Sequence, residues 1–342
     1  MQVIRFIKNW TLPCSIVMGA VTYFIFAFIP ALGPASTFLS PIMARMLPVF
    51  MFLTLYVTFC KVNFRELKVK KWHFWVALAQ LFLIVILVSS ILFFHLTGNN
   101  LILLESILTC IIGPCAAAAA VVTQKLGGNL EEMTAYTLLD NLLCAVIIPV
   151  CFPLIAPGKD INFLSAFLLI SNKVATVLIL PMLLAFITKH VNQLHSFHQW
   201  VTGIHDLGFY LWGCSLLIVT GTTMKNIIHA QTTTFFLINI AIVSLTLCMT
   251  QFLLGKLIGY FFNSSINAGQ ALGQKNTPFA IWIACTYLNP LSSVGPGCYI
   301  LWQNIINSFE IWQERKKSEK TEIAVGEKIY AIAAQQQKHL KS

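Results

Sequence analysis

The chain has very few charged residues for its length. Of its 342 residues only 10% are Asp, Glu, Lys or Arg, while 57% are hydrophobic and the mean hydropathy is +0.78. A soluble domain of this size does not stay in solution with that balance. The composition therefore excludes a soluble enzyme or binding domain and predicts an all-α polytopic membrane protein.

Several motifs that carry chemistry are also missing. There is no phosphate-binding P-loop sequence, which disfavours an ATP-driven pump, and the eight histidines do not follow the HExxH pattern of zinc enzymes. The ten cysteines are scattered through apolar stretches without CxxC spacing, so they are typical of small buried residues. The sequence accordingly predicts no metal, no cofactor and no enzymatic activity.

The apolar runs between polar or Gly/Pro breaks have the length that a membrane helix needs. They predict ten spans, arranged as five plus five. The first five lie near 11–30, 41–60, 73–95, 101–121 and 131–154, and the second five near 162–188, 206–222, 233–262, 266–288 and 293–313.

The positive charges gather in the loops of one side, which predicts an integral protein of a bacterial-type cytoplasmic membrane with both termini cytoplasmic. The opposite loops carry only Lys159 and Lys225. The net charge of +10 is then explained by topology and by anionic lipid, without a nucleic-acid partner. No small-residue cleavage site follows the first span, so we expect that span to remain in the membrane. The charges of the basic side are Arg5, Lys8, Lys61, Arg65, Lys68, Lys70, Lys71, Arg315, Lys316, Lys317 and Lys320.

Two of the predicted spans contain residues that break helices. Gly113-Pro114-Cys115, followed by Ala116 to Ala120, interrupts the fourth span, and the segment from Gly273 to Pro278 interrupts the ninth. Proline removes a backbone donor and glycine lowers the cost of unwinding beside it. Paired interruptions in corresponding halves of a chain indicate a secondary transporter with a binding site near the bilayer midplane.

Unwound backbone at this depth must be surrounded by protein or by a water-filled cavity. Two half-helix N-termini facing one cavity suit an anionic group. We therefore expect an anionic group as the partner. The candidate substrate-binding residues are Cys115, Ala116, Lys275, Asn276 and Thr277.

Ionisable residues inside spans are costly and suggest function. Arg45 and Glu105 lie nearer span ends, where they can reach the interface. Asp140 in the fifth span has Lys275 as its first candidate partner and Lys173 as a second. Three alternatives stay open: a static buried salt bridge, a pair that opens with proton or substrate binding, or groups that never meet. The candidate residues for ion or proton coupling are Asp140, Lys275, Thr137 and Asn141.

These residues resemble the bile acid:sodium symporter family. The similarity runs from Cys110 through Gly113-Pro114-Cys115 to Leu126-Gly127-Gly128-Asn129, and resumes over 271–277 and at Tyr299-Ile300-Leu301-Trp302-Gln303. The resemblance implies two inverted five-helix repeats, 1–156 and 157–314, followed by a polar cytoplasmic tail at 315–342. It also implies two discontinuous crossing helices, a core and a panel domain, and alternating access, with a small organic anion as the substrate.

The chain departs from that family where the resemblance implies sodium ligands. Where the family has a glutamate in the second break, this chain has Ala271. Where the family has a glutamine and an asparagine four residues later, this chain has Lys275 and Asn276. A one-residue shift brings Gln270 near the glutamate slot without restoring its charge. A lysine ammonium about 4 Å from sodium adds repulsion on the order of 4 kcal/mol at an effective dielectric of about 20. In the remaining slots Ala119 and Ala120 replace a serine–asparagine pair, Met133 replaces an oxygen ligand, and Thr137 is retained.

Two coupling schemes follow from the loss of the sodium ligands. In one, Lys275 and Asp140 form a proton-responsive pair; in the other, Lys275 stays charged and binds the substrate anion, giving a sodium-independent uniporter or exchanger. A non-transporting membrane sensor on the same fold is the alternative from a different functional class.

Overall fold

The computed structural model describes residues 11–62, 67–116, 118–156, 163–204 and 207–339. Over these ranges the chain is helical, and its one extended element is an isolated bridge between Cys115 and Lys275. Arg5, Lys8, Arg65 and Lys159, on which part of the topology prediction depends, lie outside the described residues.

The first half contains six α-helices and one short 3-10 helix within the described ranges. These are α2 (Thr11–Phe28), η1 (Pro30–Leu32), α3 (Gly33–Cys60), α4 (Lys71–Phe93), α5 (Gly98–Ile112), α6 (Ala119–Lys125) and α7 (Leu130–Ile155). The second half contains α8 (Phe163–His190), η2 (Asn192–Leu194), α9 (His195–Gly203), α10 (Leu207–Ile228), α11 (Thr234–Tyr260), α12 (Ser265–Gly273), α13 (Thr277–Tyr287), η3 (Pro290–Ser293) and α14 (Val294–His339).

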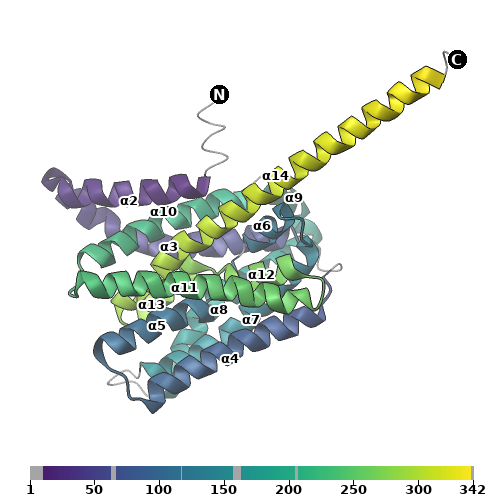
Figure 1. Cartoon of the computed structure of the whole chain (residues 1–342). Helices are drawn as coiled ribbons and strands as arrows, with labels where there is room; N and C mark the ends of the chain where they lie inside the picture. The colour runs from purple at the N-terminus through teal and green to yellow at the C-terminus, as the bar shows by residue number, and fades with distance from the viewer. Residues whose placement is uncertain (1–10, 63–66, 117, 157–162, 205–206, 340–342) are drawn as a thin grey trace.

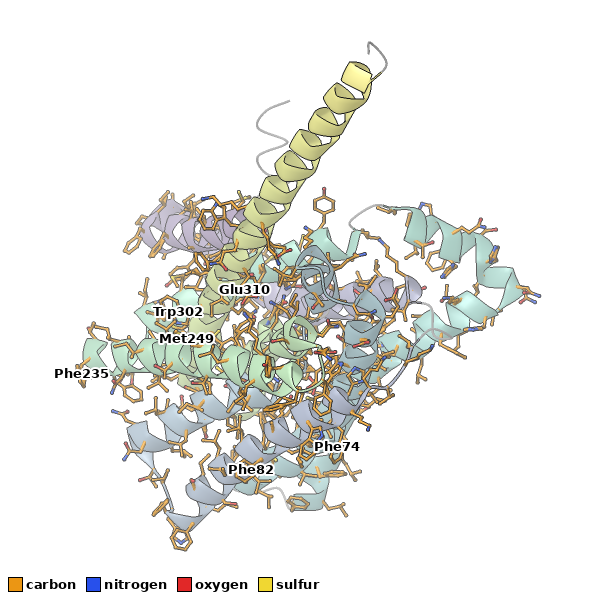
Figure 2. The ribbon with its side chains drawn as sticks, turned by 45° about the vertical axis from the view of Figure 1, so that its right-hand side comes forward. Phe74, Phe82, Phe235, Met249, Trp302 and Glu310 are labelled. Carbon is orange, nitrogen blue, oxygen red and sulfur yellow. The ribbon has the colours of Figure 1, made fainter. Side chains whose placement is uncertain are left out.

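Five helical stretches of the described chain are long and apolar enough to cross a membrane: 30–60, 71–93, 130–155, 163–190 and 234–260. Their outer faces carry large apolar side chains; Phe74, Phe82, Phe235 and Met249, which are labelled in Figure 2, are all at least half exposed. Helices of this length with such an outer face are typical of spans in contact with lipid. The protein is therefore an integral membrane protein.

The helices pack into two groups. In the first group, α10 lies against α2 and α3, and α3 lies against α8. A Cβ at Gly19 of α2 would lie only 2.4 Å from the Leu217 carbonyl oxygen of α10. The second group contains α4 to α7 and α11 to α14, in which α11 lies against both α12 and α14. The α7–α8 contact joins the two groups in sequence and in space.

Two helices differ from the sequence prediction in length. Helix α3 begins at Gly33, because Pro41 and Pro48 are both accommodated inside it. Helix α14 continues through residue 315 to His339 as one helix of 46 residues, where the sequence predicted a span near 293–313 followed by a polar tail. Figure 1 shows this helix crossing the bundle and projecting beyond it. The segment after Pro296 contains no proline to stop it.

Candidate functional site

The first interruption lies between α5 and α6. Helix α5 ends at Ile112, where Gly113 adopts an extended conformation with φ −61° and ψ 140°. Pro114 follows and has no N–H, so it cannot donate the next backbone hydrogen bond of the helix. The next helix begins only at Ala119, so the chain passes through this depth of the bundle as unwound backbone.

The second interruption lies between α12 and α13. Helix α12 ends at Gly273, and α13 begins at Thr277 with Pro278 in its first turn. A Cβ at Gly273 would lie 2.4 Å from the Phe252 ring of α11. Glycine is therefore required here for close packing, and proline is placed where its missing N–H costs nothing.

The two interruptions bind each other through their backbones. The Ala116 N–H donates to the Gln274 carbonyl at 3.0 Å, and the Asn276 N–H donates to the Pro114 carbonyl at 2.8 Å. Cys115 and Lys275 stand opposite each other in an antiparallel bridge. The unwound groups thus satisfy one another in the protein interior, which is the condition for non-helical backbone at membrane depth.

We call the place where the two interruptions meet, residues 113–116 and 274–276, the crossing. Side chains from α7 and α14 complete it. The Cys115 N–H donates to Asp140 Oδ2 at 2.6 Å. At the second interruption the Lys275 N–H donates to Gln303 Oε1 at 2.9 Å, and Gln303 Nε2 donates to the Lys275 carbonyl at 3.2 Å. Each interruption is therefore held by one polar side chain from the last helix of its own half.

Neighbouring side chains on the crossing segments point to opposite faces, as in any extended pair. Cys115 and Lys275 share one face and are buried with Asp140, at 0%, 1% and 1% exposed. Ala116 and Asn276 share the other face and line a cleft. The charged groups and the cleft therefore lie on opposite sides of the crossing.

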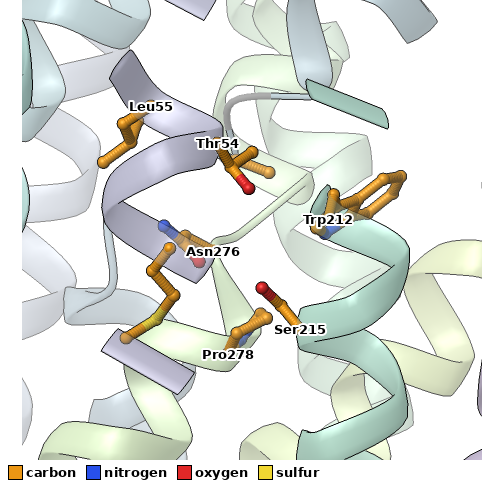
Figure 3. A pocket seen from close by; sticks show the side chains of 8 residues that line it. Thr54, Leu55, Trp212, Ser215, Asn276 and Pro278 are labelled. Carbon is orange, nitrogen blue, oxygen red and sulfur yellow. The ribbon is translucent and has the colours of Figure 1, made fainter. Parts of the chain in front are cut away.

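The cleft lies between this crossing and the group formed by α3 and α10. In this conformation the cleft is nearly filled by its own side chains: about 10 Å³ of it is open to a water-sized sphere, which is room for about one water molecule. Figure 3 shows the hydroxyl oxygens of Thr54 and Ser215 directed to the space beside Asn276, with Trp212 at one edge. The residues that line it are Met51, Thr54, Leu55, Ala116, Trp212, Ser215, Asn276 and Pro278.

Lys275 and Asp140 are neighbours without being bonded. The Lys275 ammonium is buried and has no hydrogen-bond partner, and among the described residues no salt bridge joins it to Asp140. Asp140 lies within electrostatic reach of Lys275 all the same. The static salt bridge considered from the sequence is therefore absent in this conformation.

The other predicted site residues surround the crossing. Thr137 donates its hydroxyl to the Met133 carbonyl at 2.9 Å, and Asn141 Nδ2 donates to the Thr137 carbonyl at 2.6 Å. Asn141 Oδ1 is buried without a partner. Thr277 is fully buried and lies 3.4 Å from Gln303 Nε2.

Several backbone N–H groups at the two interruptions are already bound within the protein. At the first interruption the Cys115 N–H already binds Asp140. At the second, the Thr277 N–H donates to the Lys275 carbonyl, and the Phe279 N–H donates to the Asn276 side chain, which caps α13. These three N–H groups are therefore not free to bind a ligand in this conformation.

Two of the other charged residues do not lie where the sequence suggested. Lys173 is exposed on α8, where its Nζ lies 5.9 Å from the centre of the Tyr287 ring, so it is no partner for the buried Asp140. Glu105 does not reach an interface: it is 3% exposed and accepts a hydrogen bond from the Ser292 hydroxyl. Arg45 is exposed, as expected.

Sequence reasoning missed the buried glutamines that support the crossing. Gln303 was noted only as part of a terminal motif, and Gln80 of α4 was not noted at all. Gln251 of α11 donates to the Tyr299 hydroxyl at 3.0 Å, and Tyr299 donates to the Gly273 carbonyl at 2.7 Å. The available signal was a glutamine within an otherwise apolar span, since such a group must find a partner inside the protein.

The sequence comparison places this geometry in a family. The model of the Sodium Bile acid symporter family matches residues 48–230, which is more than half of the chain and includes the first interruption. No curated protein matches the chain.

Proposed function

Because the chain belongs to the sodium bile acid symporter family, we propose that it is a secondary transporter of a small organic anion that works by alternating access. The proposed architecture has ten membrane helices in two inverted repeats, 1–156 and 157–314, with a cytoplasmic tail at 315–342. The equivalent hydrogen bonds of Asp140 and Gln303, one from each half, support the repeat.

The cleft beside the crossing is the proposed substrate site. Asn276 and Ala116 line it from the crossing, and Thr54 and Ser215 contribute hydroxyl groups from the other helix group. The Asn276 amide can donate to a carboxylate, whereas the hydroxyls of Thr54 and Ser215 donate to backbone carbonyls in this conformation and must turn from them to bind an anion. Trp212 and the aliphatic lining suit an apolar body. Cys115, Lys275 and Thr277 lie behind this surface and support it without facing the cleft.

The position of the cleft supports alternating access. It lies where α3 and α10 of one helix group meet the crossing of the other. Movement of the group α2, α3, α8 and α10 against the rest would open it on one side and then on the other. The charge distribution supports placing the ends that carry Lys61 and Lys71 in the cytoplasm.

Sodium coupling at the family's usual positions does not fit the side chains present here. A hard cation needs several oxygen ligands, but Ala119, Met133 and Ala271 offer none and are fully buried. The nearby Lys275 ammonium adds repulsion on the order of 4 kcal/mol for a separation of about 4 Å and an effective dielectric of about 20. We therefore propose transport without sodium.

Asp140 and Lys275 are the proposed coupling pair, with Thr137 and Asn141 around them. A buried ammonium without a partner is unfavourable by several kcal/mol, and so is a buried carboxylate when it loses its donor. Protonation of Asp140 weakens its bond to the Cys115 N–H and changes the charge beside Lys275. The single observation that carries this proposal is the contact between Asp140 and the first interruption, opposite the unbonded Lys275.

Counterflow in proteoliposomes tests whether the protein transports at all. Vesicles that contain the protein are preloaded with one unlabelled carboxylate at a time and placed in a dilute solution of the same compound in labelled form. For a transported carboxylate, these vesicles should accumulate the label transiently, and protein-free vesicles should not. Binding detected by thermal shift without any accumulation would contradict transport and support the sensor alternative. A replacement of Asn276 by Ala should abolish accumulation if the cleft is the binding site.

A further inference from the structure

A stripe of polar side chains runs along one face of α7 from its first turn to the crossing. Glu132, Tyr136, Asp140 and Cys144 recur every fourth residue, so they lie one above another on the helix. The Glu132 side chain is 17% exposed, whereas Tyr136 and Asp140 are each 1% exposed. The stripe therefore connects the surface to the buried carboxylate.

Helix α4 lies against this stripe with polar groups of its own. The Tyr136 hydroxyl donates to Gln80 Oε1 at 3.4 Å, and Gln80 Nε2 lies 3.7 Å from Cys144 Sγ. Cys144 Sγ in turn lies 3.7 Å from Asp140 Oδ1. Polar groups thus continue without a gap from Tyr136 to Asp140.

The outer end of the stripe contains a buried histidine. His73 is 2% exposed, its Nδ1 accepts from the Lys70 N–H at 3.3 Å, and its Nε2 has no hydrogen-bond partner. The ring lies 5.8 Å from the Tyr136 ring, measured between centres. Glu132 beside it accepts from Trp72 Nε1 at 2.9 Å and lies 3.4 Å from the Lys70 ammonium.

We propose that His73 and Tyr136 form the route by which protons reach Asp140 from the side of the chain that carries Lys70. This inference rests on the proposed proton coupling at Asp140. His73 takes up a proton at Nδ1 from the solvent side, in place of the hydrogen bond from the Lys70 N–H, and releases the proton of Nε2 toward the Tyr136 oxygen. The Tyr136 hydroxyl turns away from Gln80 Oε1 and gives its own proton to an Asp140 carboxylate oxygen, so the tyrosine ends unchanged. Rotation of the His73 ring then exchanges its two nitrogens, which resets the route after one proton has moved.

Gln80 is a positioning residue in this route. Its side-chain oxygen holds the Tyr136 hydroxyl, and its amide nitrogen faces the sulfur next to Asp140. The charged and titratable groups that face His73 are Lys70 and Glu132. Those that face Tyr136 and Asp140 are Lys275, Cys115 and Cys144. No carrier between His73 and Asp140 is in contact with solvent, because Tyr136 is buried.

Time-resolved infrared spectroscopy on the full-length protein tests the route without a substrate. A caged proton released by a light pulse should produce a carboxylic acid band that the Asp140→Asn variant removes. In His73→Gln and Tyr136→Phe the same band should rise about a hundredfold more slowly, the range in which positioned proton carriers act. Trp75→Phe, on the exposed face of α4, is the matched control and should keep the rate of the unmodified protein.

Equal rates in the unmodified protein, His73→Gln and Tyr136→Phe would overturn the route while leaving proton coupling intact. Absence of any band removed by Asp140→Asn would overturn proton coupling and the route together. Tyr136→Phe keeps the ring that stacks on Trp72, and size-exclusion chromatography verifies its fold. Gln80→Leu provides a second variant, which should slow the band through loss of the tyrosine's orientation.

Discussion

At the scale of single residues, the crossing depends on side chains that form hydrogen bonds with backbone groups which would otherwise be unpaired. Gln303 bonds both the N–H and the carbonyl of Lys275, as a neighbouring strand would. Asp140 satisfies the Cys115 N–H but adds a negative charge. The same structural task is thus performed by a neutral amide in one half and by an ionisable group in the other.

A replacement of Gln303 by Leu should destabilise the protein. It removes both partners of the Lys275 peptide groups, and each buried group left unpaired costs about 1–3 kcal/mol. We expect a clearly lower midpoint of thermal unfolding in detergent, while Gln199→Leu, at an exposed position of α9, should leave it nearly unchanged. Equal midpoints for both variants would show that the Gln303 bonds contribute nothing.

At the scale of helices, close approach decides which elements cross. Glycines at 255 and 259 of α11 face the backbone of α12, where a Cβ would lie 2.3 Å and 2.5 Å from carbonyl oxygens. Helix α14 is tied to the same pair, because Lys256 and Glu310 form an ion pair and Gln270 donates to Asn307 at 2.9 Å. The broken segment is therefore held on two sides by continuous helices.

The contact at Gly273 leads to a second prediction. In Gly273→Ala the new methyl group would overlap the Phe252 ring, so the end of α12 must shift. Overpacking of this kind typically costs about 1–3 kcal/mol, and thermal unfolding should again report it. Gly33→Ala is the matched control, since nothing lies within 4 Å of a Cβ there. A loss of stability in the control as large as in Gly273→Ala would remove the packing explanation.

Much of this element-scale arrangement follows from local sequence signals. Gly113-Pro114 and Gly273 to Pro278 predicted where the helices stop, because glycine and proline act on the backbone at their own positions. The continuation of α14 to His339 and the early start of α3 were not predicted, since polarity indicates where a span leaves the membrane and not where a helix ends. The partners Gln303 and Gln80 depend on contacts between distant parts of the chain, which no local pattern contains.

At the scale of the whole molecule, the sequence identified Asp140 and Lys275 as buried charges but could not give their relation. Only the crossing shows that both lie on the face opposite the cleft. In the proposed mechanism, a substrate in the cleft would be separated from these charges by the backbone of the crossing. In the proposed mechanism, proton binding and substrate binding act on the same two segments from opposite sides.

The most direct test of the central claim is uptake of a counterflow-active carboxylate under imposed ion gradients. With the unmodified protein, uptake should rise with an inward proton gradient and should not change when choline replaces sodium. Lys275→Gln should lose the response to the proton gradient, because the charge that faces Asp140 is gone. Stimulation of the unmodified protein by a sodium gradient alone, at constant pH, would contradict the account.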